Sequence, residues 1–129
     1  MKDFTLYPEA FELKQLGFDE PCFAFYQTEY NEDSPIMVDD DKQYSISGFR
    51  TCINSEIPNH YTSAPTYSQA FRWFREKYNC HHTINLNKKY VGIAYSSVVN
   101  FSIDEFNTYE EAELACLRKL IELVKNKES

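Results

Sequence analysis

Apolar and polar residues in segment 63–78 recur with the period of an α-helix, and we expect the rest of the chain to be organised around this segment. At 100° per residue the apolar side chains fall on one face, a stripe wide enough to be buried against other elements. Trp73 and Lys77 are expected on the flank of that face. The predicted buried face consists of Tyr67, Ala70, Phe71, Phe74 and Tyr78.

The start of this helix is marked by three residues. Thr66 suits the N-cap position, and Gln69 three residues later completes a capping box, in which each side chain bonds the other residue's backbone N–H. Pro65 disfavours extension of the helix towards the N-terminus. We therefore expect the helix to begin directly after Thr66.

The segment before this helix predicts one short helix and two strands. The short helix is expected near residues 8–16, with Gly17 in the left-handed position after its end and Phe18 placed to contact Leu13. Alternation of aromatic and smaller residues predicts strands over residues 22–30 and 44–53. The second strand contains Gly48 as a bulge or a point of close approach. The polar segments 31–43 and 55–64 are expected to be loops.

The segment after the central helix predicts a hairpin and a long helix. Residues 82–86 and 90–99 alternate on either side of a turn at 87–89, whereas residues 101–107 are interpreted as a partly extended link. Thr108 and Glu111 form a second capping box, so a helix is expected over residues 109–126. Its predicted apolar face consists of Ala112, Cys116, Leu117, Leu120, Leu123 and Val124, with Leu114 and Ile121 at its margin.

The resulting order is helix, two strands, helix, two strands, helix. Short connections favour antiparallel hairpins, so we predict an α+β fold with an antiparallel sheet of about four strands and helices packed on one face. The length of 129 residues and the lack of an internal boundary predict a single domain over residues 1–129. The wide apolar face of the last helix also leaves a homo-oligomer open.

Composition narrows the possible partners. The chain is 43% hydrophobic and 16% aromatic, which is typical of a packed domain, and carries a net charge of −7. Such a charge repels phosphate groups and therefore disfavours direct binding to nucleic acid or anionic membranes. No export signal and no run of membrane-spanning length is visible, so a cytoplasmic location is expected.

The four cysteines are spaced about thirty residues apart without a C-x-x-C pair, which favours buried thiols in a reducing compartment. Cys80 and His82, with His60, are the candidate metal ligands, but their spacing matches a zinc site imperfectly. Cys80 also follows the negative end of a helix dipole, which disfavours a nucleophilic thiolate. We therefore expect no cofactor and no enzymatic activity.

Two further groups are candidate binding residues. Asp39, Asp40 and Asp41 lie in an acidic segment that is either a solvated loop or a surface for a basic partner, and they lack the spacing of a calcium loop. Arginines beside aromatic rings can hold a flat anionic ligand, although they can also simply cover the rim of a core. The residues of this second group are Arg50, Arg72, Trp73 and Arg75.

Three stretches resemble a set of small, largely uncharacterised proteins of phage and prophage genomes. They read LKQLGFDEPCF at residues 13–23, APTYSQAFRWFREKY at residues 64–78 and TYEEAELACL at residues 108–117. The resemblance implies a phage-borne accessory protein in the cytosol of the host cell and brings no known catalytic residues.

The leading hypothesis is therefore a non-enzymatic protein that binds a host or phage protein, as an inhibitor of a host defence system. One alternative is an oligomer that binds or sequesters a nucleotide through Arg72, Trp73 and Arg75. The other is a protein with a metal site built from Cys80, His82 and His60.

Overall fold

The computed structural model describes residues 3–27, 35–37, 51–86, 88–96 and 100–128, without the side chains of residues 127 and 128. The chain divides into two compact units, Met1–Thr66 and Tyr67–Ser129, here called the N-terminal and C-terminal units. Each unit is described by itself. Whether residues 1–129 act as one domain stays a prediction.

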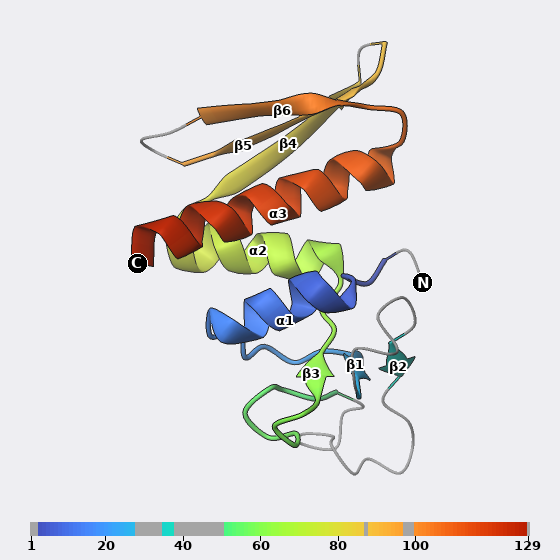
Figure 1. The fold of residues 1–129 in the computed structure, drawn as a ribbon, viewed down its shortest axis with the longest axis vertical. Coiled ribbons are helices and arrows are strands. Elements are labelled where there is room, and N and C mark those ends of the chain that lie inside the picture. The colour runs from blue at the N-terminus through green and yellow to red at the C-terminus, as the bar shows by residue number, and fades with distance from the viewer. Residues whose placement is uncertain (1–2, 28–34, 38–50, 87, 97–99, 129) are drawn as a thin grey trace. The chain divides into compact units, whose positions relative to one another are not determined.

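The N-terminal unit contains helix α1 (Tyr7–Gln15) and three short strands (Figure 1). The strands are β1 (Ala24–Tyr26), β2 (Ile36–Met37) and β3 (Thr62–Ser63), paired antiparallel in the order β2-β1-β3. Outside these strands, two isolated antiparallel bridges pair Phe4 with Thr66 and Cys22 with Cys52.

Helix α1 ends as the sequence predicts. Gly17 adopts a left-handed conformation with φ 98°. The N–H of Gly17 donates to the carbonyl of Lys14 at 3.0 Å, and the N–H of Phe18 donates to that of Leu13 at 2.9 Å. These two bonds form a Schellman motif, which satisfies carbonyls that the helix end would otherwise leave unpaired. Phe18 and Leu13 are both buried, as expected for the two hydrophobic residues of this motif.

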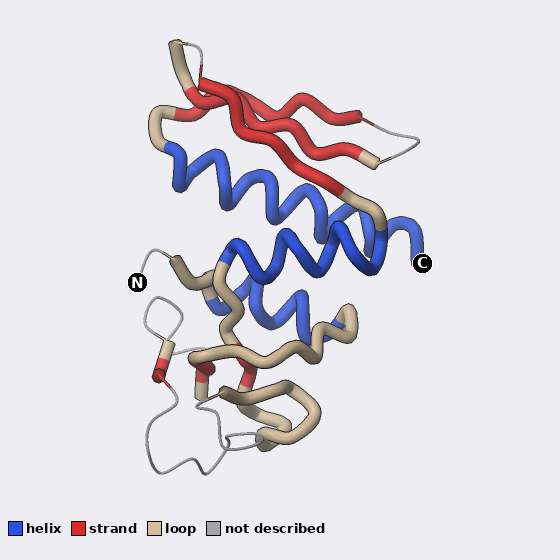
Figure 2. Tube along the Cα trace, turned by 180° about the vertical axis from the view of Figure 1, so that it is seen from behind, coloured by secondary structure: helices blue, strands red, loops and turns tan. Residues whose placement is uncertain are grey.

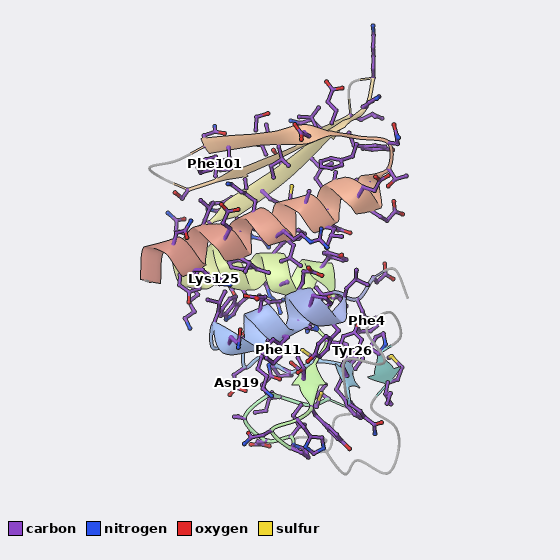
Figure 3. The ribbon with its side chains drawn as sticks, in the orientation of Figure 1. Phe4, Phe11, Asp19, Tyr26, Phe101 and Lys125 are labelled. Carbon is purple, nitrogen blue, oxygen red and sulfur yellow. The ribbon has the colours of Figure 1, made fainter. Side chains whose placement is uncertain are left out.

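The core of the N-terminal unit is built around Tyr26 (Figure 3). Its side chain is 1% exposed, and its hydroxyl donates to the carbonyl of Thr5 at 2.6 Å, so the polar end of the ring is satisfied inside the core. The ring of Tyr7 packs edge-on against that of Tyr26 with centroids 5.7 Å apart. The other members of this cluster are Ala10, Ala24, Ala64 and the partly buried Phe4.

The C-terminal unit has the order helix, three strands, helix. Helix α2 (Tyr67–Tyr78) is followed by strands β4 (His81–Leu86), β5 (Tyr90–Tyr95) and β6 (Asn100–Phe106) and by helix α3 (Tyr109–Glu128). The strands form an antiparallel sheet in the order β4-β5-β6, and α3 runs along one face of it (Figures 1 and 2). The predicted hairpin is therefore confirmed as β4 and β5.

Gly92 shows how closely this sheet and α3 pack. A Cβ atom at Gly92 would lie 2.8 Å from Sγ of Cys116 on α3 and 3.8 Å from Cβ of Ile103 on β6. Gly92 thus lies on the sheet face that α3 covers. Phe101 of β6 also meets α3, because Nζ of Lys119 lies 4.1 Å from its ring centroid.

The capping box of α3 is confirmed, with one difference in its bonding. The N–H of Glu111 donates to Oγ1 of Thr108 at 3.1 Å, and the Thr108 hydroxyl donates to Oε1 of Glu111 at 3.0 Å. The predicted apolar face is buried at Ala112, Cys116, Leu117, Leu120 and Val124. Ile121, expected at the margin, is also buried, whereas Leu123 is half-buried.

The prediction of about four strands in one sheet was wrong, since the described residues form two three-stranded sheets. The two-residue strands β2 and β3 lie in segments predicted as loops, because two residues are too few to show alternation. Strand β6 occupies the predicted link. Its register against β5 shifts between Val91 and Ile93, which breaks the period of two.

Two predicted strands are described in part. Of the strand expected at residues 22–30, the structure contains β1 and the bridge at Cys22. Of the strand expected at residues 44–53, it contains the bridge at Cys52, and Gly48 lies outside the described residues. Most of the predicted loop 31–43 also lies outside them.

Candidate functional site

Helix α2 places its two arginines in solvent. Arg72 and Arg75 are exposed and lie three positions apart, so they share one side of the helix. Asn79 ends this helix in a left-handed conformation with φ 54°, and its N–H donates to the carbonyl of Arg75 at 3.2 Å. Asn79 thus caps the turn of α2 that carries Arg75.

Trp73 does not join these arginines on the surface. Its side chain is 7% exposed, against the flank position that the periodicity predicts. The indole packs edge-on against Phe74 at 5.2 Å and against Tyr78 at 5.4 Å between centroids. Nζ of Lys77 lies 5.2 Å from its ring centroid. The indole is therefore part of the aromatic packing, and it offers little surface onto which a flat ligand can stack.

His82 is likewise part of that packing. Its imidazole stacks on the ring of Phe71 with centroids 3.6 Å apart and an interplanar angle of 17°. Burial, together with the charges of Arg75 and His81, lowers the pKa of His82 to about 4. The ring is therefore neutral near pH 7, and it packs on Phe71 as an uncharged aromatic ring.

Each candidate metal ligand has its own packing contacts. Cys80 is 5% exposed, and its Sγ lies 3.6 Å from the carbonyl of Tyr78. His60, in the N-terminal unit, packs edge-on against Tyr61 with centroids 4.5 Å apart. Across the described residues, no three His, Cys, Asp or Glu side chains form a group that could hold a metal ion.

The N-terminal unit exposes large apolar side chains that the sequence did not single out. Phe23, directly before β1, is 51% exposed, and Met37 of β2 is 47% exposed. Met37 pairs with Ala24, the residue after Phe23, so Phe23 and Met37 lie at the same end of the β1–β2 ladder. Phe25, two residues later, is in contrast 5% exposed. The chain bends at Phe23, which separates the two.

The negative charge of the protein is concentrated in the same unit. Residues 1–66 contain 12 of the 20 Asp and Glu and 4 of the 13 Lys and Arg, so their formal net charge is −8 and that of residues 67–129 is +1. The described and exposed carboxylates of this unit are Asp3, Asp19, Glu20 and Glu56. Asp39, Asp40, Asp41 and Arg50 lie outside the described residues.

Comparisons of the chain with protein-family models, with curated proteins and with solved structures gave no significant match. None of the helices in the described part of the chain is both long enough and apolar enough to cross a bilayer.

Proposed function

We propose that this protein is a non-enzymatic accessory protein of the phage type, which binds a partner protein through its N-terminal unit. The proposal rests on two features that occur together in residues 1–66. This unit has a formal net charge of −8, and it exposes Phe23 and Met37 at 51% and 47%.

The two features suit complementary parts of an interface. A concentrated negative charge attracts a basic partner and raises the rate of encounter, particularly at low salt. Exposed aromatic and methionine side chains, in contrast, are enriched at the desolvated centre of interfaces, where a few of them supply most of the binding energy. Phe23 and Met37 are candidates for such anchors, and the partner chemistry that fits them is a basic surface around an apolar pocket.

The same charge supports inhibition as the role. An acidic surface can occupy a basic site that another protein uses for phosphate groups. Together with the resemblance to phage proteins, this leads us to propose a host defence protein as the partner and the cytosol of the host cell as the location.

Affinity capture from a lysate of the host cell tests the proposal. We expect Phe23→Ser, and the triple variant Asp39→Asn, Asp40→Asn, Asp41→Asn, each to reduce capture of the same partner about tenfold, which corresponds to roughly 1.4 kcal/mol. Raising the salt concentration should weaken capture by the wild type more than by the triple variant, since fewer charges remain to be screened.

The C-terminal unit offers matched controls. Leu86 is 66% exposed, so Leu86→Ser removes a comparable apolar side chain from that unit. Asp104 and Glu105 are exposed on β6, so Asp104→Asn with Glu105→Gln removes charge there. The proposal requires these variants to capture the partner as the wild type does. Equal loss in controls and test variants, or no loss in either, would contradict it.

A further inference from the structure

Cys22 and Cys52 face each other across an antiparallel bridge in the N-terminal unit. Each N–H donates to the other residue's carbonyl at 2.8 Å, which defines a hydrogen-bonded pair. In such a pair the Cα atoms lie about 5.5 Å apart and both side chains lie on the same side of the ladder. Disulfides most often join cysteines whose Cα atoms are roughly 5.5–6 Å apart. The pairing therefore holds these two residues at a Cα separation within the range that a disulfide spans.

Both thiols are free, and each donates a weak hydrogen bond to a backbone carbonyl. Cys22 donates from Sγ to the carbonyl of Glu20 at 3.4 Å, and Cys52 donates from Sγ to that of Ala24 at 3.5 Å. Glu20 and Ala24 lie two residues before and two residues after Cys22. Joining the sulfurs therefore costs these weak S–H···O bonds. It also requires the Cβ atoms, about 5.5 Å apart in a hydrogen-bonded pair, to approach to the roughly 3.5–4.5 Å of a disulfide by a small local shift of the two segments.

We propose that Cys22 and Cys52 are an oxidation site, at which a low-molecular-weight disulfide converts the two thiols into an intramolecular disulfide. One thiolate attacks a sulfur of the small disulfide, forms a mixed disulfide and releases one small thiolate. The second protein thiolate then attacks the mixed disulfide at the protein sulfur and releases the other small thiolate. The two protein thiols lose two electrons and two protons, and the small disulfide takes them up as two small thiols.

The surroundings of the pair make this reaction slow in both directions. Both side chains are 0% exposed, and burial raises the pKa of each thiol to about 12. A small disulfide therefore reaches them when the bridge opens locally, and the completed bond is shielded from reductants once the bridge closes again. The bond closes a loop over residues 22–52, which contains Asp39, Asp40 and Asp41, and it stabilises the folded chain by restricting the unfolded one.

Peptide mapping tests the proposal directly, because trypsin separates the four cysteines. Cleavage after Lys and Arg places Cys22 in peptide 15–42, Cys52 in peptide 51–72, Cys80 in peptide 78–88 and Cys116 in peptide 90–118. The full chain is incubated with oxidised glutathione, its remaining thiols are alkylated, and the peptides are identified without reduction. We expect a linked pair of peptides 15–42 and 51–72, and a protein mass lower by about 2 Da, the mass of the two hydrogens lost.

The same reaction in urea gives the reference pattern of disulfides, because in an unfolded chain Cys22 and Cys52 also pair with Cys80 and Cys116. Cys22→Ala should abolish the linked pair, whereas Cys80→Ala and Cys116→Ala should preserve it. The oxidised wild type should unfold at higher urea than the reduced form, and dithiothreitol should remove the difference. Absence of the 15–42 to 51–72 link in folded wild type, or pairing as random as that in urea, would overturn the proposal whether or not the variants fold.

Discussion

Substitution of Gly92 by alanine tests the close packing of β5 against α3. The new Cβ atom would lie 2.8 Å from Sγ of Cys116, whereas non-bonded heavy atoms in a packed core are about 3.5–4.0 Å apart. The sheet and the helix must therefore separate locally by several tenths of an ångström. The other neighbours, the carbonyl of Ala112 at 3.7 Å and Cβ of Ile103 at 3.8 Å, are at ordinary contact distance. The contact with Sγ of Cys116 therefore decides how much the substitution costs.

The magnitude follows from two opposing effects. Overpacking of a core costs about 1–3 kcal/mol. Alanine also restricts the unfolded chain, which stabilises the folded state by roughly 0.5–1 kcal/mol where the backbone conformation suits it. We expect Gly92→Ala to lower the free energy of unfolding by about 0.5–2 kcal/mol. In a Cys116→Ala background the clashing sulfur is gone, so the same substitution should be neutral or slightly stabilising.

Urea unfolding followed by tryptophan fluorescence measures the free energy of unfolding of each variant in both backgrounds. The signal is suitable because the only tryptophan, Trp73, is buried in the same unit. The double-mutant cycle should give a coupling energy of about 0.5–3 kcal/mol between positions 92 and 116. An equal cost of Gly92→Ala in the wild-type and Cys116→Ala backgrounds would refute the packing that the structure shows.

Two further predictions concern the C-terminal unit. The pKa of His82 falls from 6.5 to about 4 on folding, so between those values the unfolded chain binds more protons and the folded state loses stability as the pH decreases. Unfolding free energies measured from pH 7 to pH 4.5 should therefore decrease more steeply for wild type than for His82→Asn, and parallel curves would contradict this. Thr108→Ala removes the cap of α3 and should lower the free energy of unfolding by about 1 kcal/mol. Thr108→Ser keeps a capping hydroxyl and should therefore retain most of the stability that the cap contributes. Equal thermal stability of the two Thr108 variants would show that the cap contributes nothing.

Helix ends and the apolar faces of helices could be predicted from the sequence because they depend on local chemistry. Gly17 marks the end of α1 since its φ of 98° is costly for residues with a Cβ atom. Thr108 and Glu111 mark the start of α3 since their side chains bond within a single turn.

The sheets could not be predicted in the same way, because their pairing depends on contacts between distant residues. Strand β3 is defined by its pairing with β1, more than thirty residues earlier in the chain, and not by any alternation of its own.

The exposure of some candidate residues could be predicted from the sequence. The exposure of Arg72 and Arg75 follows from helical periodicity and agrees with the structure. The exposed Phe23 could not be foreseen, since an aromatic residue beside a strand is more often buried, and the bend that exposes it has no marker in the sequence. The concentration of carboxylates in residues 1–66 is visible in the sequence. That it coincides with one compact unit follows only from the structure, which divides the chain after Thr66.

Site-specific photo-crosslinking in host cells tests most directly whether the N-terminal unit contacts a partner. A photoreactive phenylalanine analogue is placed at position 23 in one variant and at position 86 in another, since both native side chains are exposed but belong to different units. The account predicts a discrete adduct of one partner protein from position 23, which weakens when Asp39, Asp40 and Asp41 are neutralised. An adduct from position 86 with none from position 23 would contradict it.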